Sequence, residues 1–271
     1  MSSLTAVSDT AFLSSVTALP LHSAQDYSPL QYFPCFYQAK LPQTTAEFND
    51  TFRLRHEVYC EELCYEPLRP DNLELDQFDQ RAIHCAITEN NSGKLAGTVR
   101  LITSASVDEM LPVEKYFAGR FTNPLLAPDN FPRQHICEIS RLAVPKELRR
   151  SQLIDTAGSL TGLPALQGQC CRLVSVALYL LATLMCVRDE RHHAYVMIEP
   201  SLARILKRVG IHFIQIGDAI EFNGCRAPYY VDMRTTKATL KSDYLTLRND
   251  LDQQLFGADE TLYSSLNRAV G

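Results

Sequence analysis

The sequence predicts an α/β (α+β) fold in which a mixed central sheet is flanked by helices. Segments with the alternating pattern of strands are interspersed irregularly with segments of helical period, which argues against a regular doubly wound array. Two neighbouring strand patterns are joined by the turn sequence ENNSG (89–93), which is typical of an antiparallel hairpin. A third observation is the apolar stretch 171–191, which has the composition of a helix buried against a sheet.

Composition excludes several classes of protein. The 271 residues leave room for a sizeable core, and 46% hydrophobic with 21% charged residues is the balance of a soluble globular protein. The formal net charge of -5 does not favour a nucleic-acid partner, which usually requires a basic surface. Local basic clusters remain available for an acidic partner. The most apolar stretch, 173–187, is shorter than the roughly 20 residues of a membrane-spanning helix, so we expect no integral membrane span.

The nine cysteines indicate a reducing compartment. Their number is odd and no C-x-x-C pair occurs, so the spacing fits neither a zinc site nor a disulfide framework. The N-terminal segment 1–20 lacks the basic start and the unbroken apolar run of a signal peptide. We therefore expect reduced thiols, no metal site and a cytoplasmic location.

The N-terminal part is predicted to contain a leader, a strand and a helix. Residues 1–30 have no sustained period and read as a flexible leader. Residues 32–39 are rich in aromatic side chains and suggest a strand, which Pro34 would restrict to a sheet edge or a strand start. Thr44 or Thr45 caps a predicted helix that runs to position 63.

The remaining elements follow from alternation and from stop signals. Strands are predicted at 82–88, 94–102, 136–144, 194–198, 211–216, 219–222 and 228–233. Helices are predicted at 113–117, 171–191 and 201–209, the last with Gly210 as its C-cap. Residues 145–170 read as a long connection. These elements divide the chain into the leader at 1–30, a domain at 31–250 and a helical tail at 251–271.

Two groups of charged residues are candidates for a functional site. The first lies on the first predicted helix and in the loop after it: Arg53, Arg55, Tyr59, Glu61, Glu62, Glu74, Asp76 and Asp79. From composition alone a solvated acidic loop is the commoner explanation of such a run, because surface ion pairs are common and contribute little. The second group lies in predicted core strands, where Arg100, Glu138 and Arg141 need a partner or a cleft. A buried ion pair is the structural alternative for this group.

The directions of side chains in one predicted strand, and the motifs that are missing from the sequence, limit the classes of reaction that the protein can catalyse. Strict alternation in 136–144 places Glu138, Ser140 and Leu142 on one face of the sheet and Ile139, Arg141 and Ala143 on the other. The sequence has no G-x-x-x-x-G-K-[ST], G-x-G-x-x-G, G-x-S-x-G or H-E-x-x-H motif, so nucleotide hydrolysis, dinucleotide binding, serine-hydrolase and zinc-protease chemistry are not indicated. No spacing favours a cysteine nucleophile paired with a histidine.

Four short motifs follow one another between residues 54 and 141. They are L-R-H-x-V-[FY] at Leu54–Tyr59 with Tyr65 after it, E-x-D-x-F-D at Glu74–Asp79, Arg100 within a strand, and E-[IL]-S-R at Glu138–Arg141. In type, order and spacing these motifs resemble those of the acyl-homoserine-lactone (autoinducer) synthases, a branch of the GCN5-related N-acetyltransferase (GNAT) fold.

Further motifs refine this resemblance. They are V-Y-C-x-E at 58–62, A-x-H at 82–84, M-x-E-P-x-L-x-R-x-L-x-R-x-G-I at 197–211 and G-x-R-x-P-Y at 224–229. They resemble the acyltransferases associated with exosortase and PEP-CTERM gene clusters, which are similar to N-acyl amino acid synthases. Two departures matter: Tyr65 stands where lactone synthases have Trp, and 145–150 (PKELRR) lacks the glycines of the acetyltransferase pyrophosphate loop. The second departure favours a carrier-protein thioester over acetyl-CoA as the acyl donor.

The resemblance implies a GNAT-like, splayed central sheet and an N-acyltransferase. Such an enzyme moves a long-chain acyl group from acyl carrier protein, or from coenzyme A, to the amine of an amino acid or a related small molecule. The acyl-ACP or acyl-CoA is a co-substrate, and no tightly bound cofactor is implied.

The resemblance also assigns roles to individual residues. Catalysis falls to Glu138, Ser140 and Arg100, with Glu138 as the general base. Acceptor binding falls to Arg55, Tyr59, Tyr65, Asp76, Asp79 and Arg141. If the acceptor is an amino acid, one arginine binds its carboxylate in a bidentate pair. Donor or carrier binding falls to Leu142, Ala143, Val144, Lys146, Arg149 and Arg150, where a strand bulge would free a backbone N–H for the thioester carbonyl.

Two alternatives remain open from the sequence. One is lactone synthesis from S-adenosylmethionine on the same fold, against which Tyr65 and the C-terminal motifs argue. The other is a non-catalytic partner of a membrane export system that only binds acyl carrier protein.

Overall fold

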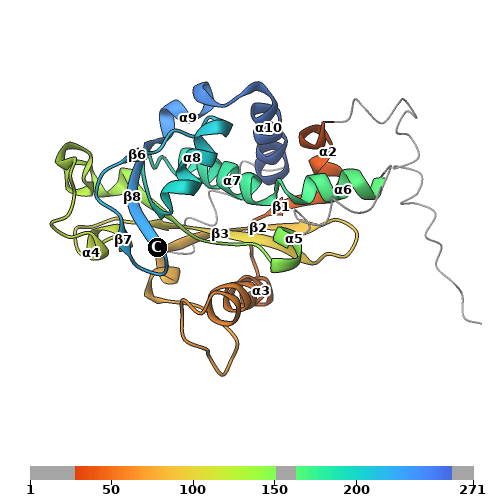
Figure 1. Cartoon of the computed structure of the whole chain (residues 1–271), viewed down its shortest axis with the longest axis horizontal. Coiled ribbons are helices and arrows are strands. Elements are labelled where there is room, and N and C mark those ends of the chain that lie inside the picture. Colours follow the sequence, from red (N-terminus) through yellow and green to blue (C-terminus); the bar gives the residue numbers. More distant parts are fainter. Residues whose placement is uncertain (1–27, 151–162, 258–271) are drawn as a thin grey trace, which may run out of the picture.

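The computed structural model describes residues 28–150 and 163–257, in which an eight-stranded sheet carries helices on both faces (Figure 1). The strand order is β1-β2-β3-β4-β5-β8-β6, and β7 pairs with β8. Strands β4 and β5 are parallel, and the other pairings are antiparallel. This mixed sheet with flanking helices confirms the predicted α/β (α+β) fold class.

The strands are β1 (Tyr37–Lys40), β2 (Ala82–Glu89), β3 (Leu95–Thr103), β4 (Ile136–Ala143), β5 (His193–Ile198), β6 (Ile214–Gln215), β7 (Ile220–Glu221) and β8 (Cys225–Asp232). The helices are α2 (Pro29–Phe36), α3 (Thr45–His56), α4 (Pro112–Tyr116), α5 (Lys146–Arg150), α6 (Leu163–Cys171), α7 (Val174–Arg188), α8 (Pro200–Val209), α9 (Met233–Thr239) and α10 (Ser242–Phe256). The predicted hairpin of β2 and β3, the strands β4 and β5 and the helices α4 and α8 are therefore confirmed. Gly210 ends α8 with a φ of 111°, the left-handed conformation expected of a C-cap glycine.

The two faces of the sheet are covered differently. Helix α7 packs on β2, β3 and β4, with α10 beside it and α2 and α6 nearby (Figure 1). Most of its side chains are buried, which confirms the predicted core helix, although it spans Val174–Arg188 rather than 171–191. The opposite face is covered by α3, which contacts β3 and β4. The chain between α3 and β2 therefore lies on the face away from the main core.

Helix α3 begins at the predicted cap and ends irregularly. The Thr44 hydroxyl accepts a hydrogen bond from the Glu47 amide at 3.3 Å, and the Glu47 carboxylate accepts one from the Thr44 amide at 3.1 Å. Beyond His56 the helix continues as a π-helix over Glu57–Glu62, whose wider turn rotates the following side chains. Within this turn Tyr59 points at the sheet and donates its hydroxyl to the Leu142 carbonyl at 2.8 Å.

The predicted strand at 32–39 is wrong over most of its length. Helix α2 occupies Pro29–Phe36, and only Tyr37–Lys40 is extended, as the edge strand β1. Pro29 has the fixed φ that suits the first turn of a helix, and helical spacing buries Leu30 and Phe33. The aromatic residues that suggested a strand instead form the inner side of this helix.

Other boundaries differ from the prediction as well. Residues 145–170 are not a plain connection, because α5 and most of α6 lie within it. The predicted strands at 211–216 and 228–233 become a two-residue β6 and a longer β8 that starts at Cys225 to pair with β7. Helix α10 already begins at Ser242, before the tail predicted from position 251. Residues 151–162 of the connection, 1–27 of the leader and 258–271 of the tail lie outside the described residues.

A bulge interrupts β4 at Arg141, whose φ is 50°. On β3 the pairing moves from Thr98 to Arg100, whereas on β4 it moves from Ala143 to Ser140, so β4 carries one extra residue. The bulge reverses the inside–outside pattern beyond it. The predicted alternation is therefore wrong from Arg141 onward: Leu142 packs on the α7 side, and Ala143 packs on the α3 side with Leu54 and Val58.

Strands β4 and β5 form a fork. Their parallel pairing covers four positions, from Ile136 opposite His193 to Ile139 opposite Val196. Beyond Ile139 the described residues of the two strands have no further pairing, so the sheet is open next to Ser140 on one side and Met197 on the other. The fork provides the splayed sheet that the resemblance implied.

Among the described residues no single helix is long and apolar enough to cross a membrane. Helices α6 and α7 together meet the criteria of length and composition, but they are bent by 47°. Most of α7 is buried against the sheet.

Candidate functional site

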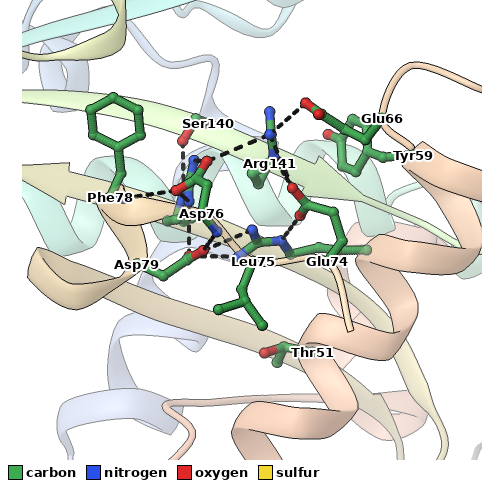
Figure 2. Close-up of polar contacts among 12 residues, drawn as sticks. Thr51, Tyr59, Glu66, Glu74, Leu75, Asp76, Phe78, Asp79, Ser140 and Arg141 are labelled. Atoms are coloured by element: carbon green, nitrogen blue, oxygen red, sulfur yellow. Dashed lines mark hydrogen bonds and ion pairs between the residues drawn. The ribbon is translucent and has the colours of Figure 1, made fainter. Parts of the chain in front are cut away.

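Charged side chains from α3, β3, β4 and the loop before β2 meet on the α3 face of the sheet (Figure 2). We call this set the ion-pair network; its members are Arg55, Glu66, Glu74, Asp76, Asp79, Arg100 and Arg141. Three guanidinium groups therefore face four carboxylates. The acidic run is not a solvated loop, because Glu74 and Asp79 are buried in this network.

Arg55 is the innermost member of the network. Its side chain has no exposed surface. Its Nε donates to Glu74 at 2.6 Å, and its two terminal nitrogens form a bidentate pair with Asp79 at 2.7 and 3.0 Å. Burial raises the pKa of Asp79, but the hydrogen bonds and charges of Arg55, together with the charge of Arg100, outweigh it and hold the pKa well below its usual range.

Arg100 connects the network to the central strands. Its Nη1 donates to Asp76 at 2.7 Å and to Asp79 at 2.8 Å, and its Nη2 donates to the second Asp76 oxygen at 3.1 Å. Its Nε donates to the Ser140 hydroxyl across the β3–β4 pair at 3.1 Å. The predicted catalytic residues Arg100 and Ser140 are therefore in direct contact.

Arg141 reaches the network because of the bulge in β4. Its Nε donates to Glu74 at 3.1 Å and its Nη2 donates to Glu66 at 2.7 Å, while its guanidinium lies 5.3 Å from the centre of the Tyr59 ring. Strict alternation would have turned this side chain to the opposite face. Arg141, Asp76 and Glu66 retain 21%, 24% and 28% of their side-chain surface, so they form the accessible rim of the network.

The loop before β2 is held by the carboxylates that also bind the arginines. Asp76 caps the short 3₁₀ helix Gln77–Arg81 by accepting from the Phe78 amide at 2.8 Å, and Asp79 accepts from the Asp76 amide at 2.7 Å (Figure 2). Below the loop, the His84 ring lies 3.4 Å from Asp79. Burial lowers the pKa of His84 to about 3, so its imidazole is neutral at pH 7.

Glu138 lies on the same face of the sheet, next to the fork. Its side chain is fully buried, and one carboxyl oxygen accepts a hydrogen bond from the Val113 amide at 2.7 Å. Within the described chain its other oxygen, Oε1, is buried without a partner. Burial raises the pKa of Glu138 to about 8, and the Val113 hydrogen bond and the charge of Arg100 offset this rise only in part. A carboxyl group with these properties exchanges a proton near neutral pH.

Tyr59 and Tyr65 form the aromatic wall of the site. The Tyr65 amide donates to the Tyr59 carbonyl at 2.8 Å, which holds the two residues side by side. Arg226 from β8 lies 5.7 Å from the centre of the Tyr65 ring. The two rings therefore connect the ion-pair network to the C-terminal part of the sheet.

The predicted donor-side residues lie at the end of β4 and on α5. Leu142, Ala143 and Val144 follow the bulge, as the resemblance implied. The Arg149 Nε donates to the Val144 carbonyl at 2.9 Å, and its guanidinium is paired with Glu62. The side chain of Arg150 lies outside the described residues. Lys146 lines a shallow groove whose other charged members are acidic: Glu57, Glu61, Glu62 and Glu147.

A separate cavity of about 630 Å³ lies between α3, the β2–β3 hairpin and α5. Leu54, Ala96 and Leu148 contribute apolar surface, and Lys40 and Glu89 lie among its charged lining residues. None of its lining residues belongs to the ion-pair network or to the predicted catalytic set. The cavity is therefore separate from the candidate site at the fork.

The structure brings together nine of the residues predicted for catalysis and acceptor binding. They are Glu138, Ser140, Arg100, Arg55, Tyr59, Tyr65, Asp76, Asp79 and Arg141. Glu66 and Arg226 were not among the predicted site residues. No motif pointed to Glu66, which the folded loop places beside Arg141, whereas Arg226 stands within the G-x-R-x-P-Y motif.

Comparison with known proteins gives a family and a set of relatives. Residues 54–158 match the acetyltransferase (GNAT) domain family. A curated acyl-homoserine-lactone synthase from Vibrio anguillarum is 24% identical over 176 residues, which cover 64% of this chain and 78% of that protein.

Two solved structures are similar at lower identity. A CoA-dependent acyl-homoserine lactone synthase, BjaI, with SAM and isopentyl-CoA superposes with a TM-score of 0.54 at 16% identity, over 79% of this chain and 88% of that one. FeeM, an N-acyl amino acid synthase from uncultured soil microbes, superposes with a TM-score of 0.51 at 14% identity, over 75% of this chain and 94% of that one. At such identities these superpositions establish the shared fold, which is GNAT-like.

Proposed function

From the premise that this chain carries a GNAT acetyltransferase domain and is an acyltransferase, we propose that it is an N-acyl amino acid synthase. The enzyme moves a long-chain acyl group from acyl carrier protein, or from coenzyme A, to the amine of an amino acid. The observation that carries the proposal is Glu138, a fully buried carboxyl group with one unpartnered oxygen at the fork of β4 and β5.

The proposed acceptor site is the rim of the ion-pair network. With three arginines against four carboxylates, the network has a surplus of one negative charge, which favours an ammonium group. Asp76 and Glu66 are the carboxylates with accessible surface beside Arg141. The acceptor binds there as an ammonium ion and is then deprotonated for reaction.

Glu138 is the proposed base. An α-amino group has an ordinary pKa near 8, which is close to the pKa of about 8 that burial gives Glu138. Proton transfer from the ammonium to the Glu138 carboxylate, directly or through one water, is therefore nearly balanced in free energy. Next to Glu138, the hydrogen-bonded pair of Ser140 and Arg100 provides the polar groups of the proposed site.

The bond changes follow from this arrangement. The neutral amine nitrogen attacks the thioester carbon at the fork, where a backbone N–H beside the bulge stabilises the oxyanion. The C–S bond breaks, the thiolate leaves and takes up a proton lost by the nitrogen, and an amide is formed. Leu142 and Ala143 at the end of β4, with Val144 directly after it, border the thioester in this scheme.

The test uses the purified full chain with a palmitoyl-carrier protein or palmitoyl-CoA and an equimolar mixture of the amino acids. Mass spectrometry of the organic extract is expected to show N-acyl amino acids that increase with enzyme and time. Acyl lactones formed with S-adenosylmethionine would instead support lactone synthesis, the activity named for the Vibrio anguillarum relative. No acylated amine from any of these mixtures would contradict the proposed function.

Docking of an acidic carrier protein at α5 gives a second measurable expectation. Charge reversal of Lys146 to Glu should lower kcat/KM with acyl carrier protein by about tenfold, because Lys146 is the one positive charge among the described residues that line this groove and its replacement leaves only carboxylates, which repel an acidic carrier. The rate with acyl-CoA should stay unchanged. Lys237→Glu, the same charge reversal at an exposed position of α9, serves as the control. An equal loss with both donors contradicts carrier docking at α5.

A further inference from the structure

The arginines of the ion-pair network are already committed to carboxylates of the protein. Arg55 binds Glu74 and Asp79, and all three of its nitrogens donate hydrogen bonds. Arg100 likewise donates from each nitrogen to Asp76, Asp79 or Ser140. An acceptor that brings its own carboxylate would meet a network with a negative surplus. Within the described chain, Arg141 donates from Nε to Glu74 and from Nη2 to Glu66, which leaves Nη1 alone for a further partner. A bidentate pair with the acceptor carboxylate therefore calls for a further cation near the fork.

Arg226 is that cation. It stands in β8 opposite Ile220 of β7, and its side chain is half-buried. Its Nε donates to the Asn223 carbonyl at 2.9 Å and its Nη1 donates to the Met197 carbonyl at 3.3 Å. Among the described residues no carboxylate lies within ion-pair distance of it. Its guanidinium is therefore held by two carbonyl groups and the Tyr65 ring rather than by a carboxylate of the described residues.

Backbone geometry places the Arg226 guanidinium at the open side of the fork. Pro228, opposite Met197 in the β5–β8 pair, has no N–H, and its carbonyl accepts from Ile216 on the other side. Met197 and Pro228 are therefore not a hydrogen-bonded pair, so the Met197 carbonyl points away from β8 and toward β4. The Arg226 nitrogen that binds this carbonyl reaches the gap beyond Val196 where β4 and β5 separate.

Arg226 also lies on the face of the sheet that carries the site. Tyr230 belongs to the core cluster on that face, together with Ile136 and Tyr195, and the period of two along β8 gives Arg226 the same side. The contact of its guanidinium with the Tyr65 ring agrees with this placement. Burial raises the pKa of Tyr59, and the positive charges of Arg141 and Arg226 both oppose this rise, as expected if the two arginines flank the aromatic wall.

We infer that Arg226 binds the carboxylate of the acceptor, which makes the acceptor class α-amino acids with a free carboxylate. Nη2 of Arg226 has no partner among the described residues, and with Nη1 it offers the fork geometry that suits a carboxylate. This inference rests on the proposed function and specifies its substrate.

The test compares an amino acid with its carboxamide. The wild-type enzyme is given the amino acid that it acylates fastest from the equimolar mixture, and separately the carboxamide of that amino acid, with the same acyl donor. Loss of a charged hydrogen-bonding partner is worth about 1.5–3 kcal/mol, so Arg226→Gln should raise KM for the amino acid by about 10- to 100-fold. KM for the carboxamide and KM for the acyl donor should stay the same, and Arg226→Lys should restore part of the loss.

Arg204→Gln, which removes an exposed arginine of α8, is the matched control and should leave both KM values unchanged. Equal KM values for amino acid and carboxamide with wild-type enzyme would overturn the inference but not the acyltransferase function. A rise confined to the KM of the acyl donor would also overturn it, because it would assign Arg226 to the donor phosphate. If no amine is acylated at all, the proposed function fails, and thermal stabilisation of wild type but not Arg226→Gln by amino acids decides the binding role separately.

Discussion

Replacing Glu138 with glutamine is expected to lower kcat for acyl transfer by about 10²-fold or more while the fold is kept. Glutamine has nearly the same shape and can still accept the hydrogen bond from the Val113 amide, but it cannot take a proton from the acceptor. Steady-state kinetics at saturating substrates measures the change. Glu138→Asp, which keeps a carboxyl group but shortens its reach, should retain more activity than the glutamine variant. A glutamine variant with a near wild-type kcat would exclude the base role.

The pH dependence gives the same prediction an independent readout. Burial raises the pKa of Glu138 to about 8, so the carboxylate that acts as base is formed as the pH rises through about 8, and kcat should rise with it. In the folded protein the group holds its proton up to a higher pH than in the unfolded chain. Its contribution to stability is therefore complete below about pH 4.5 and is lost as the pH rises toward about 8.

Urea unfolding of wild type and Glu138→Gln at several pH values tests this sign. Glutamine cannot ionise, so the variant should lack this loss of stability with rising pH. Above about pH 8 it should be at least as stable as wild type. A wild-type protein that gains stability over this range relative to the variant would show that Glu138 is ionised without cost. Such a result would remove the physical basis of the proposed base.

Asp79→Asn is expected to destabilise the protein by about 3–5 kcal/mol, the cost of removing one partner from a buried ion pair. One Asp79 oxygen accepts from both Arg55 and Arg100, and the other accepts from Arg55 and from the Asp76 amide. Asparagine removes the negative charge with which both arginines are paired. It also places its amide N–H groups against N–H donors of the protein. Chemical denaturation of the purified variant measures the change.

Asp50→Asn is the matched control, because Asp50 forms an exposed pair with Arg53 on α3. Its effect should be within about 0.5 kcal/mol.

The stability of wild type and of the asparagine variant can also be compared at acidic pH. The pKa of Asp79 is held below its usual range, so the stability it contributes is present above its ordinary pKa and is lost as the pH falls. The asparagine variant should lose less stability on acidification, and equal effects of Asp79→Asn and Asp50→Asn would contradict the buried network.

Sequence patterns predicted the fold class and most of the central sheet because its strands and turns are encoded locally. The hairpin of β2 and β3, the cap at Thr44 and the glycine end at Gly210 depend on residues only a few positions apart. The strand at 32–39 was predicted wrongly because aromatic composition does not separate a strand from a short buried helix. Packing of α2 against α6 and α10 decides that case, and those partners are distant in sequence.

The candidate site was predicted as far as its motifs extend. Charged residues in core strands pointed to Arg100, Glu138 and Arg141, and the structure brings them to one face. The family resemblance implied a bulge near the end of β4, but the local pattern showed neither its position at Arg141 nor the π-helix after His56, because both change the side-chain period without a marker residue such as Gly or Pro. The partners of the arginines could not be predicted either. Only the folded chain shows that Arg55 and Arg100 bind carboxylates of the protein, whereas Arg226 binds carbonyl groups.

The double role of Asp79 has a consequence for local opening. The same carboxylate closes the turn at 76–79 and joins Arg55 of α3 to Arg100 of β3, so the loop cannot leave the sheet without breaking the ion pairs that connect α3 to β3. Amide hydrogen exchange in this loop should therefore proceed with one common protection factor shared with the second half of α3, as in a single cooperative unit. A surface loop of ordinary acidic composition would exchange within seconds on its own. Slow amide exchange in residues 76–79 would show that this loop is a rigid part of the fold and does not open to admit substrate.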